Sequence, residues 1–141
     1  MKSRKTRRVR SRCPVNVAVE ILGDRWTLLV LRDLMLKGRV TFKSMLEAEE
    51  GIATNILADR LGRLEAEGIV EKVPDANDRR RARYCLSAKG LDLAPVLVDM
   101  MIWSSTYYDT AAPAREIDEM RYRRRRYLAR VRADATKEAG R

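Results

Sequence analysis

The sequence predicts a mainly α-helical fold with one small β-hairpin, and two observations support this class. Apolar residues recur at helical spacing over most of the chain. Between residues 69 and 86, two alternating segments enclose a basic loop, which is typical of a pair of strands. Because two strands alone are only marginally stable, we expect the hairpin to pack against the helices. The 141 residues, 45% of them hydrophobic, suffice for one domain with its own core.

Capping residues and glycines set the expected helix boundaries in the first half of the chain. A side-chain oxygen at the first position satisfies a free backbone N–H, and a glycine favours the end of a helix. We expect four helices there: 15–22 before Gly23, 25–36 after Asp24, 42–48 after Thr41, and 54–67 before Gly68.

The second half of the chain predicts the hairpin and two further helices. The strands are expected at 69–73 and within 79–86. Ser87 caps a long helix over 88–108, in which Pro95 predicts a kink or a restart. A break at 111–113 is followed by a last helix that begins at Pro113 or Ala114 and extends to about residue 132.

The composition excludes several classes of active site. The chain has no histidine, which rules out Ser-His-Asp and Cys-His arrangements and imidazole metal sites. Its two cysteines, Cys13 and Cys85, are too few for a cysteine-only zinc site. No carboxylate pair stands beside a nucleophile or a glycine-rich phosphate loop. We therefore expect no catalytic residue, no metal and no cofactor, and an enzyme is the weakest of the functions considered.

Basic residues gather at both ends of the chain. The net charge of +10 divides into +7 over residues 1–12, −4 over 13–120 and +7 over 121–141. Such ends can merely keep a protein soluble, or they can add phosphate contacts that raise affinity without selecting sequence. We expect a disordered basic arm at 1–12, a central domain at 13–110 and a basic helical extension at 111–141.

The expected helices at 42–48 and 54–67 follow each other after a short turn. This arrangement is typical of a helix-turn-helix, and also of an ordinary helical pair in a core. The second helix has an apolar face, formed by Leu57, Leu61 and Leu64, and an opposite face that is polar at its start. A helix that enters the major groove by its N-terminus would present Thr54, Asn55 and Asp59 first. A solvated face, with Thr54 as a cap, is the alternative.

The loop of the hairpin is densely basic. Residues 75–83 read DANDRRRAR, with four arginines in five positions. Their mutual repulsion costs stability unless an anion relieves it. A solvated turn needs no such density of one sign, whereas a wing laid along a phosphate backbone or in a narrow minor groove would use it. The pattern favours nucleic-acid binding.

Five segments and Trp103 together match one known family: CPV at 13–15, LGDRWTLLVLRDLM at 22–35, TFKSML at 41–46, GIATNILADRLGRLEAEGIVEK at 51–72, and RRRARYCLSAKGLDLAP at 79–95. The chain resembles the HxlR-type winged helix-turn-helix transcription regulators, which are relatives of the MarR group. The resemblance covers about residues 13–108. The family usually has arginine before the phenylalanine of its third helix and glutamate after it, where this chain has Thr41, Lys43 and Ser44.

The resemblance implies a homodimer that binds a pseudo-palindromic operator. It implies a recognition helix at 54–67 in the major groove and a wing at 74–83 on the adjacent backbone or minor groove. The full expected fold is thus a dimeric winged helix-turn-helix with an extra basic C-terminal helix. The DNA-binding residues that we predict are Arg39, Lys43, Ser44, Thr54, Asn55, Asp59, Arg60, Arg63, Arg79, Arg80 and Arg81.

The first helix and the long helix carry apolar residues on more than one face. One helix of a small domain rarely buries apolar surface all round without a partner, so we expect these two to form the dimer interface, as the family does. A core role is the alternative for the long helix. The interface residues that we predict are Val15, Val19, Leu91, Val98, Met101 and Ile102.

Cys13 lies beside the basic arm, where a positive neighbourhood lowers the pKa of a thiol. The resemblance implies that some family members sense oxidants or electrophiles near this position, so Cys13 is a candidate redox-sensing residue; a small buried residue is the alternative. The tail beyond Pro113 is longer than the family typically shows. It could contact phosphates, bind RNA or pack on the partner subunit.

The sequence therefore predicts a DNA-binding transcription regulator, with repression the favoured mode and double-stranded DNA and a second copy of the chain as partners. A general nucleic-acid binder driven by the basic ends, and a module that docks on an acidic protein, are the alternatives. The sequence does not identify the operator, the regulated genes or an effector, whether a small molecule or a redox signal. Because no signal peptide or apolar run of ~18 residues is present, we expect a cytoplasmic protein associated with a bacterial-type nucleoid and not with a membrane.

Overall fold

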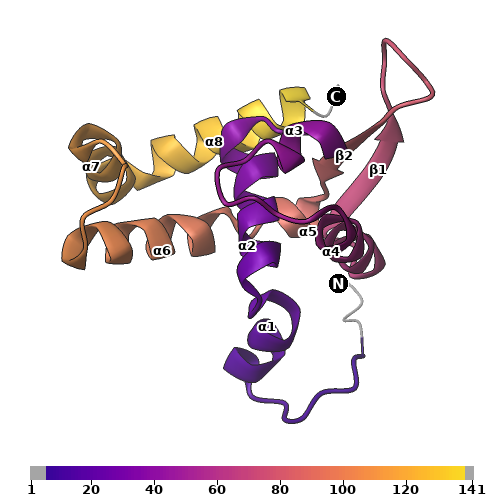
Figure 1. Ribbon diagram of the computed structural model, residues 1–141. Helices are drawn as coiled ribbons and strands as arrows, with labels where there is room; N and C mark the ends of the chain where they lie inside the picture. The colour runs from indigo at the N-terminus through magenta and orange to yellow at the C-terminus, as the bar shows by residue number, and fades with distance from the viewer. Residues whose placement is uncertain (1–5, 139–141) are drawn as a thin grey trace.

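The computed structural model describes residues 6–138, which are mainly α-helical with one antiparallel β-hairpin, as predicted (Figure 1). In Figure 1 the hairpin and α4 lie at one side of the molecule, and α7 lies at the other. The elements in chain order are α1 (Pro14–Leu22), α2 (Arg25–Arg32), the π-helical η1 (Asp33–Lys37), α3 (Phe42–Leu46), α4 (Thr54–Ala66), β1 (Val70–Pro74), β2 (Ala82–Leu86), α5 (Ala88–Leu91), α6 (Ala94–Tyr107), α7 (Ala114–Tyr122) and α8 (Arg124–Glu138).

The three predicted caps are confirmed. The Asp24 carboxylate accepts hydrogen bonds from the backbone N–H groups of Trp26 at 2.8 Å and Thr27 at 3.0 Å, at the start of α2. Thr41 forms a capping box with Ser44 at the start of α3. Ser87 accepts from the Gly90 N–H at the start of α5. These caps begin the helices at the residues that the sequence indicates.

The hairpin is tied to the segment that precedes α3. β1 and β2 pair from Val70 opposite Leu86 to Pro74 opposite Ala82. The Tyr84 N–H donates to the carbonyl oxygen of Val40 at 2.7 Å, and residues 41 and 83 form an isolated β-bridge. The hairpin therefore has a third, very short strand-like neighbour at its base, while its tip at residues 75–81 extends away from the helices (Figure 1).

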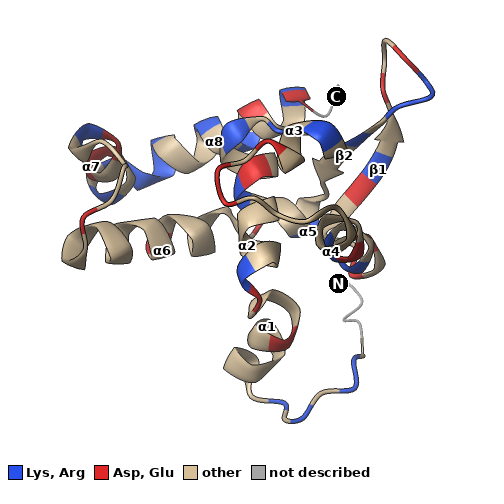
Figure 2. Cartoon of the chain, in the orientation of Figure 1, with Lys and Arg blue, Asp and Glu red and all other residues tan. Residues whose placement is uncertain are grey.

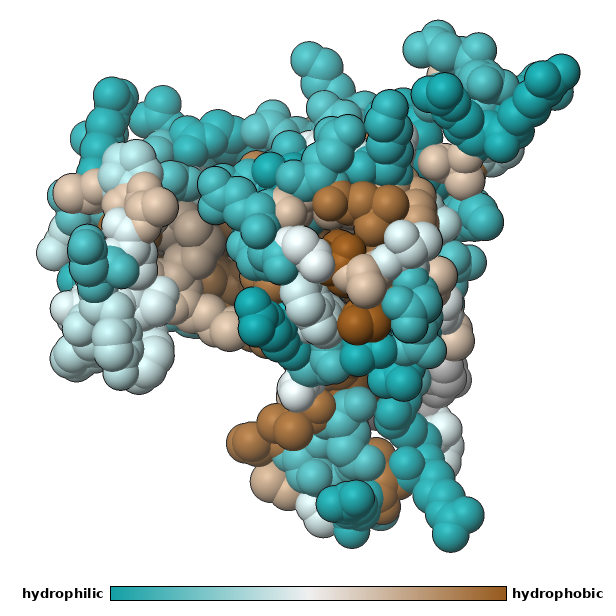
Figure 3. All heavy atoms as spheres, in the orientation of Figure 1, coloured by the Kyte–Doolittle hydropathy of each residue, from teal (hydrophilic) through white to brown (hydrophobic). Residues whose placement is uncertain are grey.

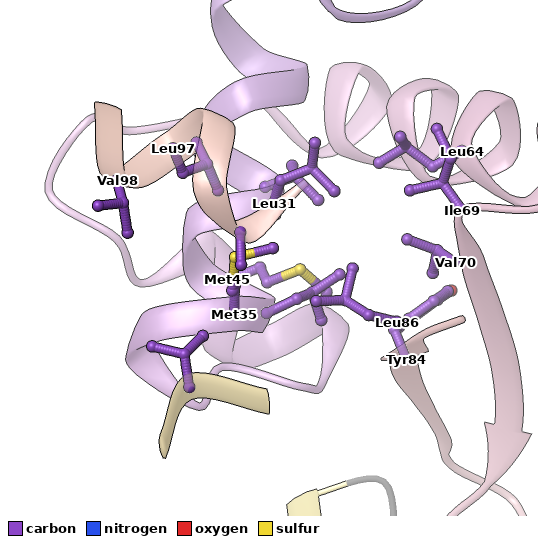
Figure 4. Packing of buried hydrophobic residues seen from close by; sticks show 14 of the residues in the cluster. Leu31, Met35, Met45, Leu64, Ile69, Val70, Tyr84, Leu86, Leu97 and Val98 are labelled. Atoms are coloured by element: carbon purple, nitrogen blue, oxygen red, sulfur yellow. The ribbon is translucent and has the colours of Figure 1, made fainter. Parts of the chain in front are cut away.

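The core forms between α2, α4, the hairpin and α6 (Figure 4). The predicted leucine stripe of α4 is buried there, with side chains 0–2% exposed: Leu57, Leu61 and Leu64. Leu31 of α2 and Met45 of α3 face the same cluster. Because one face of α4 is buried in this core, its opposite face is exposed to solvent.

Two predicted helices are each divided in two. The segment expected as one helix over 88–108 is α5 and α6, and the second begins beside Pro95, whose missing N–H is tolerated only in the first turn. The segment expected as one helix to 132 is α7 and α8, which are separated at Arg123, where φ is −128° and ψ is 38°. This break turns α8 back across the molecule.

The C-terminal extension packs against the rest of the chain and not away from it. α8 contacts η1, β2 and α6, and buries one face in the core, formed by Tyr127, Val131 and Ala135. Its arginines Arg124 and Arg132 form ion pairs with Asp99 and Asp92 at 2.7 and 2.9 Å. Within residues 6–138, no helix is long and apolar enough to span a membrane.

Candidate nucleic-acid interface

The exposed face of α4 starts with two exposed polar residues. Thr54 and Asn55 are both exposed in the first turn, and the helix is preceded by Ala53, which provides no side-chain cap. Thr54 therefore is not the N-cap that the sequence left as its alternative role. Both residues lie in the first turn of the helix, where hydrogen-bonding groups can meet base edges.

Arg60, in contrast, is turned toward its own protein. Its Nε and Nη2 atoms donate to the two carboxylate oxygens of Asp24 at 3.0 and 2.9 Å, and its Nη1 donates to Asp59. Hydrogen bonding from Arg60 is the main reason that the pKa of Asp24 falls to about 2. This bidentate pair joins the start of α2 to the middle of α4, so Arg60 fixes the position of α4 against α2.

Arg63 remains available on the outer face of α4. Its side chain is 66% exposed, and its Nε lies 2.9 Å from a carboxylate oxygen of Asp59, one helical turn earlier. Asp59 thereby contacts both Arg60 and Arg63. An exposed i,i+4 pair of this kind is weak in water and can open toward a phosphate or a base.

The residues predicted around α3 divide into one free and two engaged side chains. Lys43 is exposed. The Ser44 hydroxyl is used in the capping box, where it donates to the Thr41 carbonyl oxygen at 2.8 Å. Arg39 forms an ion pair with the buried Asp33 at 2.9 Å. Within residues 6–138, Lys43 is thus the predicted side chain near α3 that can reach a ligand without first losing a hydrogen-bond or ion-pair partner.

Asp33 belongs to a network that fixes the turn between α3 and α4. Arg32 donates to Asp33 and makes a bidentate pair with Glu50, with distances of 2.6 and 2.8 Å to the two Glu50 oxygens. The Arg32 guanidinium is the main cause that lowers the pKa of Glu50 to about 2. Glu50 lies in the turn between α3 and α4, so this ion pair ties the turn to the end of α2.

The wing tip carries the densest exposed charge. Arg79, Arg80 and Arg81 are all exposed, and Figure 2 shows their blue segment at the outermost part of the hairpin. Arg81 lies 3.8 Å from Asp78, and its side chain is 76% exposed. Arg83 at the base of the wing was not among the predicted residues: it donates to the Glu138 carbonyl oxygen at 2.7 Å, which joins the wing to the end of α8.

The predicted dimer residues lie in two different environments. Val15 and Val19 on α1 are 71% and 55% exposed, and Figure 3 shows brown apolar surface over α1. Val98 is 1% exposed and packs in the core of its own chain, so its assignment to the dimer face was wrong. Leu91, Met101 and Ile102 are half-buried against the same core.

The outward face of α6 is a different apolar row that the sequence analysis missed. Its members follow the i, i+4, i+7, i+11 spacing of one helix face and are 44–70% exposed: Val96, Met100, Trp103 and Tyr107. Trp103 also contacts the ring of Tyr108, with centroids 5.8 Å apart. An exposed apolar row of this length on a small domain marks an interaction surface.

Cys13 is exposed at the start of α1, and Cys85 is buried in β2. The backbone N–H groups of Asn16 and Val15 lower the pKa of the Cys13 thiol. The alternative of a small buried residue therefore does not hold for Cys13. No group of three or more Cys, Asp or Glu side chains placed to hold a metal ion occurs between residues 6 and 138.

Comparison with known proteins agrees with this geometry. A family model described as HxlR-like helix-turn-helix matches residues 21–112. The uncharacterized HTH-type transcriptional regulator sll1512 of Synechocystis sp. is 36% identical over 88 residues, which cover 62% of this chain and 64% of that protein. The uncharacterized HTH-type transcriptional regulator YvaP of Bacillus subtilis is 34% identical over 98 residues, which cover 69% of this chain and 90% of that protein.

The fold is also found among solved structures. The redox regulator HypR in its oxidized form is similar to this chain with a TM-score of 0.61 and 25% identity, over 70% of this chain and 100% of that one. This chain spans less than two thirds of the length of sll1512. Because the family model matches well over half of the 141 residues, and the helix pair and wing have the geometry described above, the chain belongs to the HxlR-like helix-turn-helix family.

Proposed function

We propose that the protein is a sequence-specific, DNA-binding transcription regulator that acts as a repressor and binds a pseudo-palindromic operator as a homodimer. The observation that carries the proposal is the division of α4 into a buried leucine face and an exposed face that begins with Thr54 and Asn55, beside a wing tip with three exposed arginines. A regulator with this role acts at the nucleoid, in the cytoplasm.

The side chains have separate roles in this proposal. Thr54, Asn55 and Arg63 contact base edges in the major groove, because hydrogen-bonding groups there distinguish all four base pairs. Lys43 and the wing arginines contact phosphates, which supply affinity without sequence information. Arg60 acts through Asp24 as a positioning residue. Arg39 and Ser44 are engaged within the chain and hold the segment around α3 in place, without a contact to DNA.

The homodimer would form through the apolar rows of α1 and α6. Val15 and Val19 on one helix and Trp103 and Tyr107 on the other are exposed in a single copy of the chain. A second copy that covers these rows would remove them from water and set two α4 helices at a fixed spacing. Sedimentation of a monomer at micromolar concentration would contradict this part of the proposal.

The roles of base and phosphate contacts can be separated by two arginine variants. On an operator selected from random DNA, Arg63→Ala is expected to relax base choice by about 1–3 kcal/mol at the affected position. Arg81→Ala is expected to weaken operator and random duplex to a similar degree and to reduce the salt dependence. Equal effects of both variants on every duplex would favour a general nucleic-acid binder instead.

The signal that this regulator senses is a second part of the proposal. HypR, to which this chain is similar, is a redox regulator. Cys13 is exposed and has a lowered thiol pKa at the start of α1, next to the proposed dimer face. We expect oxidation of Cys13 to change operator affinity and Cys13→Ser to abolish that change, as measured by fluorescence anisotropy with and without diamide. An operator affinity that is indifferent to thiol reagents would remove Cys13 from this role.

A further inference from the structure

The N-terminal basic arm, residues 6–12, is held beside the recognition helix. Arg7 forms an ion pair with Glu67, the C-cap residue of α4. The Arg10 N–H donates to the Glu20 carboxylate of α1 at 3.2 Å. The Asn16 amide donates both to that carboxylate and to the Ser11 carbonyl oxygen, at 2.6 and 2.9 Å. The described part of the arm is therefore anchored at two places, on α4 and on α1.

These anchors place the arm on the α1 side of α4. A groove of about 400 Å³ lies between the arm, α1 and α4, and Arg7, Val19 and Arg63 are among its lining residues. Arg63 belongs to the exposed face of α4, so the arm lies next to the face that meets DNA in the proposed function. Figure 1 shows the hairpin rising from α4 on one side and the arm approaching α4 from α1 on the other.

The remaining arginines of the arm are free to bind an anion. Arg8, Arg10 and Arg12 are exposed, and none of their guanidinium groups forms an ion pair with any residue in 6–138. Extended chain covers roughly 3.3 Å per residue, and duplex DNA carries a charge about every 1.7 Å along its axis. Residues 8–12 are therefore long enough to lie beside several phosphates of a duplex.

We propose that the arm is a second phosphate-binding element, which lies on the DNA backbone between the two half-sites of the operator, while the wing lies on the outer flank. The inference rests on the proposed function, because the proposed homodimer forms through α1, and the arm is anchored on the α1 side of α4. In that dimer, the order from the centre of the operator outward is arm, recognition helix and wing.

Two triple variants of the full chain test whether the arm binds phosphate. In the first, Arg8, Arg10 and Arg12 are replaced by glutamine; in the matched control, Arg123, Arg125 and Arg126 are. The control residues are also exposed and form no ion pair with other residues in the described part of the chain. Both variants lose three positive charges, so net charge is held equal.

The measured quantity is the slope of the logarithm of the association constant against the logarithm of salt concentration. Each lost phosphate contact reduces this slope by about 0.9, so the arm variant of a dimer is expected to lose up to about 5 in slope and the control less than 1. Equal losses in both variants would overturn the inference, because they would show an effect of net charge alone. An unchanged slope in the arm variant would also overturn it.

The position of the contact is tested with duplexes that carry neutral methylphosphonate groups at the operator centre or at its outer flank. Central groups are expected to weaken wild-type binding but to add nothing to the loss in the arm variant, whereas outer groups weaken both proteins. The reverse pattern would contradict the placement. If selection yields no operator, the proposed function fails, and the salt slopes on random duplex still decide whether the arm binds phosphate.

Discussion

The two basic ends of the chain have the same net charge but differ in how their described parts pack and pair. Residues 1–12 and 121–141 each contribute +7. In the described part of the arm, Arg8, Arg10 and Arg12 are exposed without an ion-pair partner in residues 6–138. In the extension, Arg124, Arg130 and Arg132 are paired with Asp99, Glu119 and Asp92, whereas Arg123, Arg125 and Arg126 form no ion pair with other residues in 6–138. Charge composition alone therefore does not show whether a basic segment is available to a ligand.

Apolar spacing explains the difference between the two ends. The extension places Tyr127, Val131 and Ala135 at intervals of four, so a helix buries all three against the core and brings its arginines to the acidic side chains beside it. The arm has a single large apolar residue in its described part, Val9, and has no such stripe.

The largest effect on stability is expected when a buried side chain of the extension is removed from the core. Met120 in α7 is fully buried, so Met120→Ala is expected to lower the free energy of unfolding by about 3 kcal/mol. The matched change in the arm, Val9→Ala, should alter it by less than about 0.5 kcal/mol, since Val9 is outside the core cluster. Urea denaturation measures both. Similar losses for the two variants would show that the arm is also part of the folded core.

The next largest effect is expected from Arg60→Gln, which separates an arginine that positions α4 from one that binds DNA. Arg60→Gln releases α4 from Asp24, and operator affinity is expected to fall about tenfold, or about 1.4 kcal/mol. The salt slope is expected to stay the same, because no phosphate contact is lost. A fall in slope of about 0.9 per subunit would place Arg60 on the DNA, and Arg60 would then resemble the arm arginines.

Acid is expected to weaken the ion pairs that Asp24 and Glu50 form within the chain. The pKa values of Asp24 and Glu50 are lowered to about 2 by Arg60 and Arg32. Since these values lie below those of the unfolded chain, the stabilisation is complete above about pH 4.5 and is lost as the pH falls toward 2. We expect a loss of about 1 kcal/mol in total, because both carboxylates are partly exposed and screened.

The pH dependence is measured by urea denaturation between pH 5 and pH 2.5. The double variant Asp24→Asn with Glu50→Gln cannot titrate at these positions, so its stability is expected to change less over the same interval. Parallel losses in the variant and in the wild type would assign the acid sensitivity to other carboxylates.

The smallest effect is expected from single ion pairs of the extension. Arg132→Gln removes an exposed pair with Asp92, and such pairs contribute about 0.5 kcal/mol or less. Operator binding and its salt slope are expected to remain at the wild-type values. A clear reduction of the slope would mean that Arg132 leaves Asp92 for a phosphate when DNA is present.

Local signals predicted much of the fold, whereas the DNA contacts stay predictions. The caps at Asp24, Thr41 and Ser87, the α4 leucine stripe and the basic hairpin tip each depend on residues a few positions apart, and the structure confirms all of them. The contact of Arg60 with Asp24 joins residues 36 positions apart, and no local pattern indicates it. The sequence therefore gives no sign of the partner that Arg60 has within the chain, and its role as a DNA contact stays a prediction.

The long helix shows a second limit of sequence patterns. α6 is apolar on more than one face, so helical periodicity does not distinguish the inward Val98 from the outward Met100 and Trp103. The direction of α8 was equally hidden, because it is set by the break at Arg123, where no glycine or proline marks a helix end. Both features depend on contacts between distant segments, which only the folded chain reveals.

The most direct test of the proposed function is selection of bound duplexes from a random DNA pool at moderate salt, followed by sequencing. A dimer that presents two copies of α4 is expected to enrich an inverted repeat whose half-sites are about one helical turn apart. The selected duplex should bind at least about 10³-fold more tightly than random DNA. Tight binding without an enriched motif, lost steeply as salt rises, would contradict sequence recognition and leave the basic residues as the main source of affinity.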